Sequence, residues 1–374
     1  MYVYHSEGTM KTTRIPRLGK NAGRPATGLA TLLRLEIAAG RLTGGQFLPT
    51  ERQLAQRHGV ARMTVRRALK QLEGDGLIAA EPRQGYRVRL GAANDPGHGC
   101  PIAFVLATAH SPELWDDLHK TLLGAFQVAA GRRGCPLLSV SSHGLPQHEV
   151  LEQLKASRAW GAVLDTTNPE LLALVARNGL PAVMVDAWRE DATIDAVVQD
   201  DYQGGLLAAN YLAGQGHRRI AWLGSVAASA HSLGRFAGVV AGLTRAGLDL
   251  PPTLRIEATD SDAPSKAREL LSRLDRPSAV LALWSTPSQA VVRAGQELGL
   301  VPGRDFETVG WSTEEQYPTK YHPGFPEGLV PPAILWSAAT MAEMAVTRLA
   351  ERRANPLAHA VKINVPVRLY LPGQ

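Results

Sequence analysis

Residues 48–69 read LPTERQLAQRHGVARMTVRRAL, a pattern that predicts two short helices joined by a tight turn. Thr50 is placed to cap the first helix, which is expected to end near Gly59. The apolar residues of the second helix recur at helical spacing, so one face is predicted to be buried. The opposite face carries Arg62, Thr64, Arg66 and Arg67. Guanidinium groups bind guanine bidentately and clamp phosphates, so this surface suits the major groove of DNA.

The charge of the chain is divided unevenly along its length. Residues 1–90 hold sixteen Lys and Arg against six Asp and Glu, a net charge of +10. The whole chain carries +6, so the remaining residues carry −4. With 374 residues, two or three domains are expected. The division predicts a basic module that binds a polyanion, most simply nucleic acid, beside a mildly acidic body.

The basic module is expected to extend over residues 24–90 as a DNA-binding domain. A first helix is predicted over 28–39, where apolar residues recur before Gly40. After the two helices of the opening motif, short strands at 77–80 and 86–90 form a predicted hairpin, or wing. The flanking segments are a disordered basic tail, residues 1–23, and a linker rich in Gly, Pro and Ala, residues 91–100.

This module resembles the GntR-type winged helix-turn-helix family over about 65 residues. The family pattern has a Leu-Pro-Ser/Thr-Glu-Arg start, a Val-Ser/Thr-Arg recognition turn and a glycine in the wing. The resemblance implies DNA contacts from Arg52, Arg62, Arg66 and Gly85. Gln84 and Arg87 of the wing are expected to contact phosphates, and Arg67 is either a DNA contact or only solvated. Ala61 stands where the family usually has Ser or Thr, so one hydroxyl that caps the helix or binds phosphate is missing.

From residue 101 onward, short apolar strands alternate with helices, which predicts a parallel α/β fold. Strands are expected at 102–106, 137–140, 161–164, 182–185, 219–223, 279–283 and 308–310. Helices are expected at 114–131, 147–157, 202–215 and 233–246. The two sets of units predict two subdomains with a ligand cleft at the carboxyl ends of their strands. The first comprises about 101–198 plus 327–360, and the second about 199–326 plus the C-terminal strand.

The segments VVQDDYQGG at 197–205, GHRRIA at 216–221 and RFAG at 235–238 are similar to the effector domain of LacI/GalR regulators. That domain resembles periplasmic sugar-binding proteins, and the similarity runs from about residue 101 to the C-terminus. A GntR-type head on a LacI-type body is the arrangement of arabinose-type repressors. The resemblance implies a homodimer that binds double-stranded operator DNA and a small-molecule effector, with a carbohydrate favoured. The sequence allows the effector either to release DNA or to promote its binding.

The same resemblance places Arg235 against the effector, because its fork of donors suits paired oxygens. Trp115 is expected to line the cleft, where an indole face packs well on a sugar ring. Asp165, Asp186 and Asp200 follow strands or lie near the crossing between subdomains. Each of these aspartates either accepts from ligand hydroxyls, caps a strand end or pairs with a basic group.

The later strands depart from the LacI pattern, which usually ends them with Asn-Asp and Gly-Tyr/Phe-Asp. Here the corresponding residues are Trp284-Ser285 and Gly310-Trp311-Ser312. Both carboxylates are absent, so we expect Trp284 and Trp311 to form an aromatic wall beside Ser312 for a larger or less polar ligand, a glycoside or an aromatic acid. Trp160 and Trp222 lie inside apolar runs and are predicted to be core residues.

Other functional classes are disfavoured by what the sequence lacks. Cys100 and Cys135 have no partners at metal-ligand spacing, so neither a metal nor a cofactor is predicted. Two cysteines in so long a chain fit a protein of the reducing cytoplasm. The first ~20 residues lack a secretory apolar stretch, and the uncharged run at 328–342 is too short to span a membrane. A transport binding protein and a GntR-headed aminotransferase are the rival interpretations, but no nucleophile elbow, phosphate loop or cofactor lysine supports an enzyme.

Overall fold

The computed structural model describes residues 25–38, 42, 45–81, 84–88, 100–106, 117–189, 191 and 193–373. The main division of the chain falls between Pro101 and Ile102. We call residues 25–88 the head and residues 102–373 the body, and each is described by itself. The expected tail, 1–23, and most of the expected linker, 91–100, lie outside the described residues.

The head packs the helices α1 (Pro25–Ala38), α2 (Glu51–His58) and α3 (Arg62–Gly74) with a hairpin of β1 (Ile78–Glu81) and β2 (Gly85–Val88). The inward stripe expected on the second helix of the opening motif is buried in α3. The centre of the core is formed by Leu29, Leu33, Leu54, Val65, Leu69, Leu72, Ile78 and Val88. Burial of this stripe turns the arginines of α3 outward, as the spacing predicts.

Local signals in the sequence explain where α2 begins and ends. The Thr50 hydroxyl accepts from the backbone N–H of Gln53, and the Gln53 side chain accepts from the backbone N–H of Thr50. This capping box satisfies two amide groups that the first helical turn leaves free. Gly59 ends the helix at φ +67°, in the left-handed region that glycine adopts without a Cβ penalty.

A further backbone pairing in the head lies outside the expected hairpin. Residues 45–48 run beside β2, and Leu48 N–H donates to the Tyr86 carbonyl at 2.8 Å. Phe47 forms an antiparallel bridge with Arg87. The segment that leads into α2 therefore holds one edge of the wing, a pairing that local sequence patterns do not reveal.

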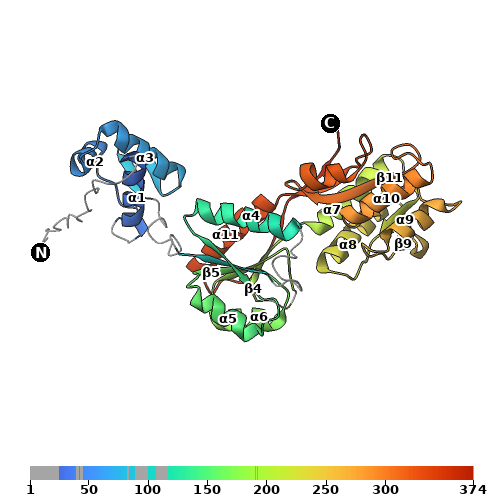
Figure 1. Ribbon diagram of the computed structural model, residues 1–374, viewed down its shortest axis with the longest axis horizontal. Coiled ribbons are helices and arrows are strands. Elements are labelled where there is room, and N and C mark those ends of the chain that lie inside the picture. Colours follow the sequence, from blue (N-terminus) through green and yellow to red (C-terminus); the bar gives the residue numbers. More distant parts are fainter. Residues whose placement is uncertain are drawn as a thin grey trace, which may run out of the picture. The chain divides into compact units, whose positions relative to one another are not determined.

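Within the described residues, the first sheet of the body consists of six parallel strands. In spatial order these are β13 (Lys362–Val365), β7 (Asp195–Gln199), β6 (Ala182–Val185), β5 (Gly161–Asp165), β3 (Ile102–Leu106) and β4 (Leu137–Ser141). Figure 1 shows α4 (Asp117–Arg132) and α11 (Ala338–Ala354) over one face, and α5 (Gln147–Ala156) and α6 (Pro169–Arg177) over the other. The inner strands β3, β6 and β7 are buried on both faces, which explains their continuous apolar sequences.

The second sheet, as far as the chain is described, also has six strands, and its edge strand β14 is antiparallel to its neighbour. In order they are β14 (Val367–Tyr370), β12 (Ala333–Trp336), β11 (Glu307–Thr313), β10 (Ala279–Ala282), β8 (Ile220–Leu223) and β9 (Arg255–Ile256). Its helices include α7 (Asp201–Gly214), α8 (Ala230–Arg245), α9 (Ala263–Ser272) and α10 (Ser285–Glu297). The winged head and the two parallel-sheet lobes confirm the predicted α/β fold class.

The structure corrects the expected boundary between the two lobes near the C-terminus. We assigned 327–360 to the first subdomain, but β12 at 333–336 pairs with β11 in the second sheet. Of that segment, α11 does pack on the first sheet, against β5, β6 and β7. The chain then adds β13 to the first sheet and β14 to the second, so it crosses between the lobes repeatedly. An assignment of long continuous segments to each lobe misses such crossings, because β12 and α11 are adjacent in sequence but belong to different lobes.

Glycines allow α7 and α8 to approach each other closely. A Cβ on Gly205 would lie 2.1 Å from the Arg235 carbonyl oxygen, and one on Gly238 would lie 2.0 Å from the Tyr202 carbonyl oxygen. A Cβ on Gly204 would lie 2.2 Å from the Trp311 ring. The glycines of the segments VVQDDYQGG and RFAG thus bring Arg235 next to the start of α7 and leave room for an indole beside it.

Candidate functional site

The DNA-facing candidates of the head lie mainly on α3 and at the start of α2. Arg52, Arg62, Arg66 and Arg67 are exposed, and Thr64 is partly buried. Arg66 makes a bidentate ion pair with Glu51, in which its Nε and Nη2 donate to the two carboxylate oxygens at 3.0 Å. The hydrogen bond from Arg66 lowers the pKa of the Glu51 carboxyl. This pair joins α2 to α3 and fixes the direction of one arginine on the exposed face.

The wing candidates occupy different environments. Gln84 and Gly85 are exposed, and Gly85 has φ +106°, a conformation that side chains rarely adopt. Arg87 is partly buried, with its guanidinium carbon 4.5 Å from the centre of the Phe47 ring. Its Nε is buried without a hydrogen-bond partner in the described structure. The wing therefore presents Gln84 and a glycine turn to solvent and keeps Arg87 against an aromatic ring.

The N-terminus of α3 lacks a side-chain cap. Ala61 occupies the cap position, and no side-chain hydrogen bond satisfies the first amides of the helix there. The first turn of α3 instead bonds back to the Ala61 carbonyl, from Thr64 N–H at 2.9 Å and Val65 N–H at 3.2 Å. This agrees with the missing hydroxyl inferred from the sequence, and it leaves N–H groups at this helix end for an external acceptor such as phosphate.

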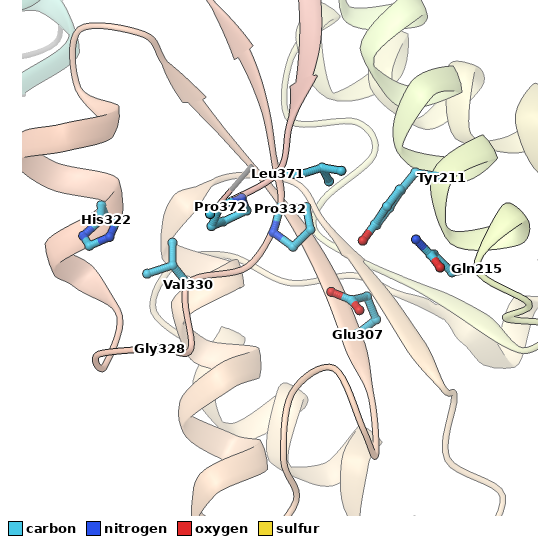
Figure 2. Close-up of a pocket in the computed structure, with 10 residues that line it drawn as sticks. Tyr211, Gln215, Glu307, His322, Gly328, Val330, Pro332, Leu371 and Pro372 are labelled. Atoms are coloured by element: carbon cyan, nitrogen blue, oxygen red, sulfur yellow. The ribbon is translucent and has the colours of Figure 1, made fainter.

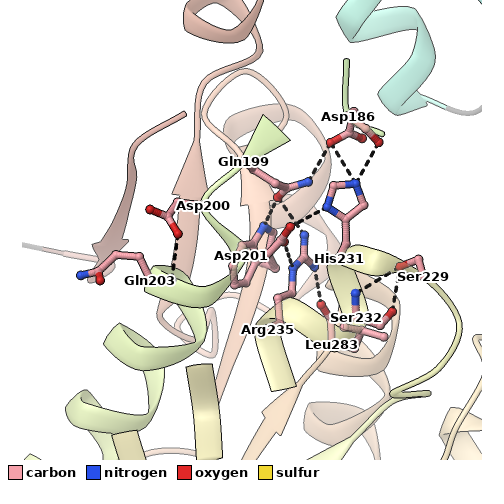
Figure 3. A network of polar contacts seen from close by, with 11 residues as sticks. Asp186, Gln199, Asp200, Asp201, Gln203, Ser229, His231, Ser232, Arg235 and Leu283 are labelled. Carbon is pink, nitrogen blue, oxygen red and sulfur yellow. Dashed lines mark hydrogen bonds and ion pairs between the residues drawn. The ribbon is translucent and has the colours of Figure 1, made fainter. Parts of the chain in front are cut away.

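In the body, Arg235 lies at the centre of a polar network between the lobes (Figure 3). It projects from α8 and is 1% exposed. Its Nε donates to Asp201, its Nη1 to the Leu283 carbonyl and its Nη2 to Gln199, each at 2.8 Å. Burial lowers the pKa of Arg235 to about 10, although the carboxylates of Asp201 and Asp186 oppose that shift. Each of the three guanidinium nitrogens therefore already donates a hydrogen bond within the protein.

Two indole rings cover the faces of the same guanidinium. The Arg235 guanidinium carbon lies 3.8 Å from the centre of the Trp284 ring and 3.6 Å from that of Trp311. The Trp311 Nε1–H donates to the Gln199 side-chain oxygen at 2.8 Å. The two tryptophans expected to form an aromatic wall thus come together, with a cation between them rather than an open cavity. Arg235, Trp311 and neighbouring residues line a cavity of about 10 Å³, roughly the room of one water molecule.

His231 connects the two lobes one turn before Arg235 on α8. Its Nδ1 lies 2.6 Å from an Asp201 carboxylate oxygen, and its Nε2 lies 2.8 Å from the Asp186 carbonyl oxygen. Burial alone would lower the pKa of His231, but the charges of Asp186 and Asp201 and the hydrogen bond to Asp201 raise it to about 9. Asp186 follows β6 of the first lobe at φ +46°, a strained conformation for a residue with a side chain.

Gln199 completes the network from the end of β7. Its side-chain oxygen accepts from both Arg235 and Trp311, and its Nε2 donates to an Asp186 carboxylate oxygen at 3.0 Å. Asp186 and Gln199 belong to the first lobe, whereas His231, Arg235 and Trp311 belong to the second. We call these five residues together with Asp201 the interlobe network. It joins the lobes through charged and neutral hydrogen bonds.

Not every predicted effector residue lies in the interlobe network. Asp200 caps α7 by accepting from Gln203 N–H at 3.0 Å, a role that the sequence left open beside ligand contact. Asp165 ends β5 and lies 3.7 Å from the His119 ring. Ser312 is buried on β11, and Trp115 lies outside the described residues. Trp160 and Trp222, expected in the core, are 5% and 2% exposed.

Sequence reasoning missed Gln199, Asp201 and His231. His231 precedes Arg235 by four residues, so both point from the same face of α8, and that spacing was a usable signal. Asp201 is the second of two adjacent aspartates at 200–201. The position at which α7 begins decides which of the two caps the helix and which pairs with Arg235. Gln199 carried no local signal, because only the meeting of two lobes brings it to Arg235.

Metal and membrane chemistry have no support in the part of the chain that the structure describes. Among those residues, no group of three His, Cys, Asp or Glu side chains is arranged to hold a metal ion. Cys135 is buried and Cys100 is exposed. In the same described segments, no helix combines the length and the apolar character needed to cross a membrane.

Comparison with known families assigns both parts of the chain. Residues 25–88 match the family of bacterial regulatory proteins, gntR family. Residues 102–288 match the periplasmic binding proteins and sugar binding domain of LacI family, and 209–371 match a periplasmic binding protein-like domain. The LacI-type match covers half of the chain.

Individual relatives are distant. The chain is 27% identical over 194 residues to the arabinose metabolism transcriptional repressor of Geobacillus stearothermophilus, an alignment that covers 50% of this chain but only 52% of the repressor. It is 24% identical over 285 residues to the HTH-type transcriptional repressor PurR of Erwinia tasmaniensis, covering 71% of this chain and 80% of that protein.

Solved structures show the same fold at low identity. A transcriptional regulator CelR–cellobiose complex superposes with a TM-score of 0.60 at 19% identity, covering 87% of this chain and 99% of that one. A LacI family regulator from Enterococcus faecium with bound ribose has a TM-score of 0.58 at 17% identity, covering 72% and 97%.

A winged DNA-binding head and a two-lobed parallel-sheet body define a transcriptional regulator with an effector-binding domain, not an enzyme. The chain belongs to the LacI-type family of periplasmic-binding-protein-like domains and carries a gntR-type helix-turn-helix head.

Proposed function

We propose that this regulator is a cytoplasmic, operator-specific repressor whose affinity for DNA is controlled by a small molecule bound between the lobes. Two heads of a homodimer would read two half-sites related by the two-fold axis of the dimer. The observation that carries the proposal is the interlobe network, because Arg235 and His231 of the second lobe meet acceptors of the first lobe, the Gln199 side chain and the Asp186 carbonyl. A ligand that changes these contacts changes the relation of the lobes, and thereby the spacing of the heads.

On DNA, α3 is proposed to enter the major groove. Arg62 is the proposed base-reading residue, since it is exposed at the first turn of the helix. Arg66 is held by Glu51, so it presents a fixed direction and is suited to a phosphate or a single base edge. Gln84 of the wing and Arg52 are proposed to bind backbone phosphates. Arg67 and Arg87 are assigned weaker roles, the latter because it packs on Phe47.

In the body, the effector is proposed to compete with protein acceptors for the hydrogen-bond donors of Arg235. Each guanidinium nitrogen already donates to Asp201, Gln199 or the Leu283 carbonyl, and only about 10 Å³ of space remains beside the group, so ligand oxygens are proposed to replace at least one of these acceptors. A hydrogen bond to a charged group contributes about 1.5–3 kcal/mol, and only a ligand that restores such a bond can bind tightly. Gln199 is the partner to be displaced, because it is neutral and belongs to the other lobe.

Carbohydrates and their derivatives are the first candidate class. Relatives include a repressor of arabinose metabolism and fold neighbours with cellobiose or ribose. Paired hydroxyls suit the guanidinium of Arg235, and an indole suits the face of a sugar ring.

An aromatic acid is the second candidate, favoured by the two indoles around Arg235 and by Ser285 and Ser312 in place of carboxylates. Calorimetry on Trp311→Ala tests whether a ligand uses this ring. We expect loss of effector affinity, and an unchanged affinity would contradict the use of this ring by a ligand.

Fluorescence anisotropy of the full chain on DNA from upstream of its own gene tests the proposal directly. The titration is repeated with sugars, glycosides and aromatic acids at fixed salt, because phosphate contacts make affinity depend on ionic strength. Specific binding that one compound weakens or tightens identifies the operator, the effector and the sign of control. Binding to every DNA with equal affinity would contradict an operator-specific role. Sedimentation of the free protein checks the dimer.

A further inference from the structure

A second cavity lies in the body away from the interlobe network, beside the C-terminal strand. It measures about 460 Å³ and is lined by α7, the start of β11 and the segment after β14 (Figure 2). The described lining residues are Tyr211, Gln215, Glu307, His322, Gly328, Val330, Pro332, Leu371, Pro372 and Gly373. A cavity of this size accommodates a small organic molecule.

Three polar side chains of this cavity lie at the same end of it. Figure 2 shows Tyr211 and Gln215 projecting from α7 toward Glu307, which begins β11. Tyr211 interacts with the Gln215 side chain, and burial together with the charge of Glu307 raises the pKa of its phenol. A phenol, an amide and a carboxylate therefore share one end of the cavity, while Pro332 and Leu371 supply apolar walls.

Glu307 has no cationic partner among the described residues. No ion pair or side-chain hydrogen bond of its carboxylate is found there, and burial raises its pKa without an opposing cation. This differs from other partly buried carboxylates of the body, such as Asp195, which accepts from Arg348 and Arg352. A half-buried carboxylate on the wall of a cavity, without a counter-charge, favours a ligand that brings one.

We propose that this cavity binds a small organic cation, a primary amine or diamine, through a charged hydrogen bond to Glu307. Tyr211 and the Gln215 carbonyl supply further acceptors for the ammonium group, which has three donors. The alkyl part lies against Pro332 and Leu371. The site is separate from Arg235, which is positively charged and repels such a ligand, so the proposal does not depend on the identity of the cleft effector.

The test is isothermal titration calorimetry of the full chain without DNA, with putrescine as the probe and 1,4-butanediol as its neutral analogue. We expect putrescine to bind and the diol to bind at least about tenfold more weakly, since it lacks the charge. Glu307→Gln should weaken putrescine binding by about tenfold or more, and Tyr211→Phe by a smaller factor. Glu149→Gln, which alters an exposed carboxylate on α5, is the matched control and should leave the affinity unchanged.

Several results would overturn the proposal. These are the absence of putrescine binding to the wild-type chain, equal binding of the diol, and equal loss in the Glu149→Gln control. Circular dichroism of Glu307→Gln checks that the fold is retained, which is expected because the substitution removes an uncompensated charge. If that variant fails to fold, the Tyr211→Phe titration decides. Failure here leaves DNA binding by the head untouched, so it is distinguishable from failure of the proposed function.

Discussion

Arginine has opposite roles in the two parts of this molecule. Arg62 in the head is exposed on a helix face, whereas Arg235 in the body is 1% exposed and held by Asp201, Gln199 and a backbone carbonyl. The exposed side chain keeps its donors in water and can exchange water for DNA at little structural cost. The buried one already donates to three protein acceptors, so the proposed ligand would have to exchange protein contacts for its own.

This contrast separates two requirements, one for the recognition of DNA and one for the coupling of effector binding to the arrangement of the lobes. A surface that reads DNA requires donors that are not essential for folding. A cleft that transmits a signal requires contacts whose loss changes the arrangement of the lobes. The predictions below test whether the two arginines differ in this way.

The largest effect is expected for Arg235→Met, which removes one of the two cationic partners of Asp201, His231 being the other, and takes the Arg235 donors from Gln199 and the Leu283 carbonyl. We predict a loss of about 3–5 kcal/mol in the free energy of unfolding, measured by urea denaturation and circular dichroism. The same substitution at Arg62 should change it by less than about 0.5 kcal/mol, because that side chain is exposed. Adding Asp201→Asn to Arg235→Met should recover part of the loss. Equal effects at Arg235 and Arg62 would remove the basis of the comparison.

The interlobe network also predicts a pH dependence of stability. The pKa of His231 is raised to about 9 from 6.5, so the folded state binds a proton more tightly than the unfolded state. The resulting stabilisation is complete below about pH 6.5 and is lost as the pH rises toward 9, with a total of about 3 kcal/mol. Urea denaturation between these pH values measures the loss, and His231→Gln should flatten it. A variant with the same slope as the wild type would assign the dependence to other groups.

In the head, Arg62→Ala is expected to weaken operator binding by about 1–3 kcal/mol and to relax the preference for one base pair. Anisotropy titrations on the operator and on single-base variants at fixed salt measure both effects. Arg304→Ala provides a control, since it changes an exposed arginine of the body. An equal loss of affinity on all DNA sequences would show that Arg62 binds phosphate. Another side chain would then have to recognise the bases.

The fold of both parts follows from local patterns in the sequence. The stripe from Val65 to Leu72 predicts the buried face of α3, and the continuous apolar strands predict the parallel sheets. These features depend on residues close in sequence, where helical and strand periodicity apply. The lobe assignment of β12 could not be predicted in the same way, because strand pairing depends on contacts distant along the chain.

The candidate site could be predicted only in part. The segment RFAG indicates Arg235 as an effector residue, and the tryptophans at 284 and 311 are expected in the same pocket, but their stacking on Arg235 is not predicted. Their arrangement depends on Gln199, which is 36 residues from Arg235 and 112 from Trp311, and on the small volume of Gly204. Sequence patterns give residue types at a site, but whether a guanidinium faces a ligand or the protein depends on how the lobes meet.

The smallest effect concerns the N-terminus of α3, where the cap residue Ala61 has no side-chain acceptor for the first amides of the helix. Ala61→Ser adds a hydroxyl that can accept from the first amides of the helix, so we predict a gain of about 1 kcal/mol in the stability of the head. Thermal denaturation measures the gain, and Ala61→Val, which adds atoms without an acceptor, should give none. If serine and valine behave alike, the cap is not limiting. A gain in stability without a change in DNA affinity would show that these amides do not contact DNA. Tighter DNA binding would show that residue 61 takes part in the DNA contact.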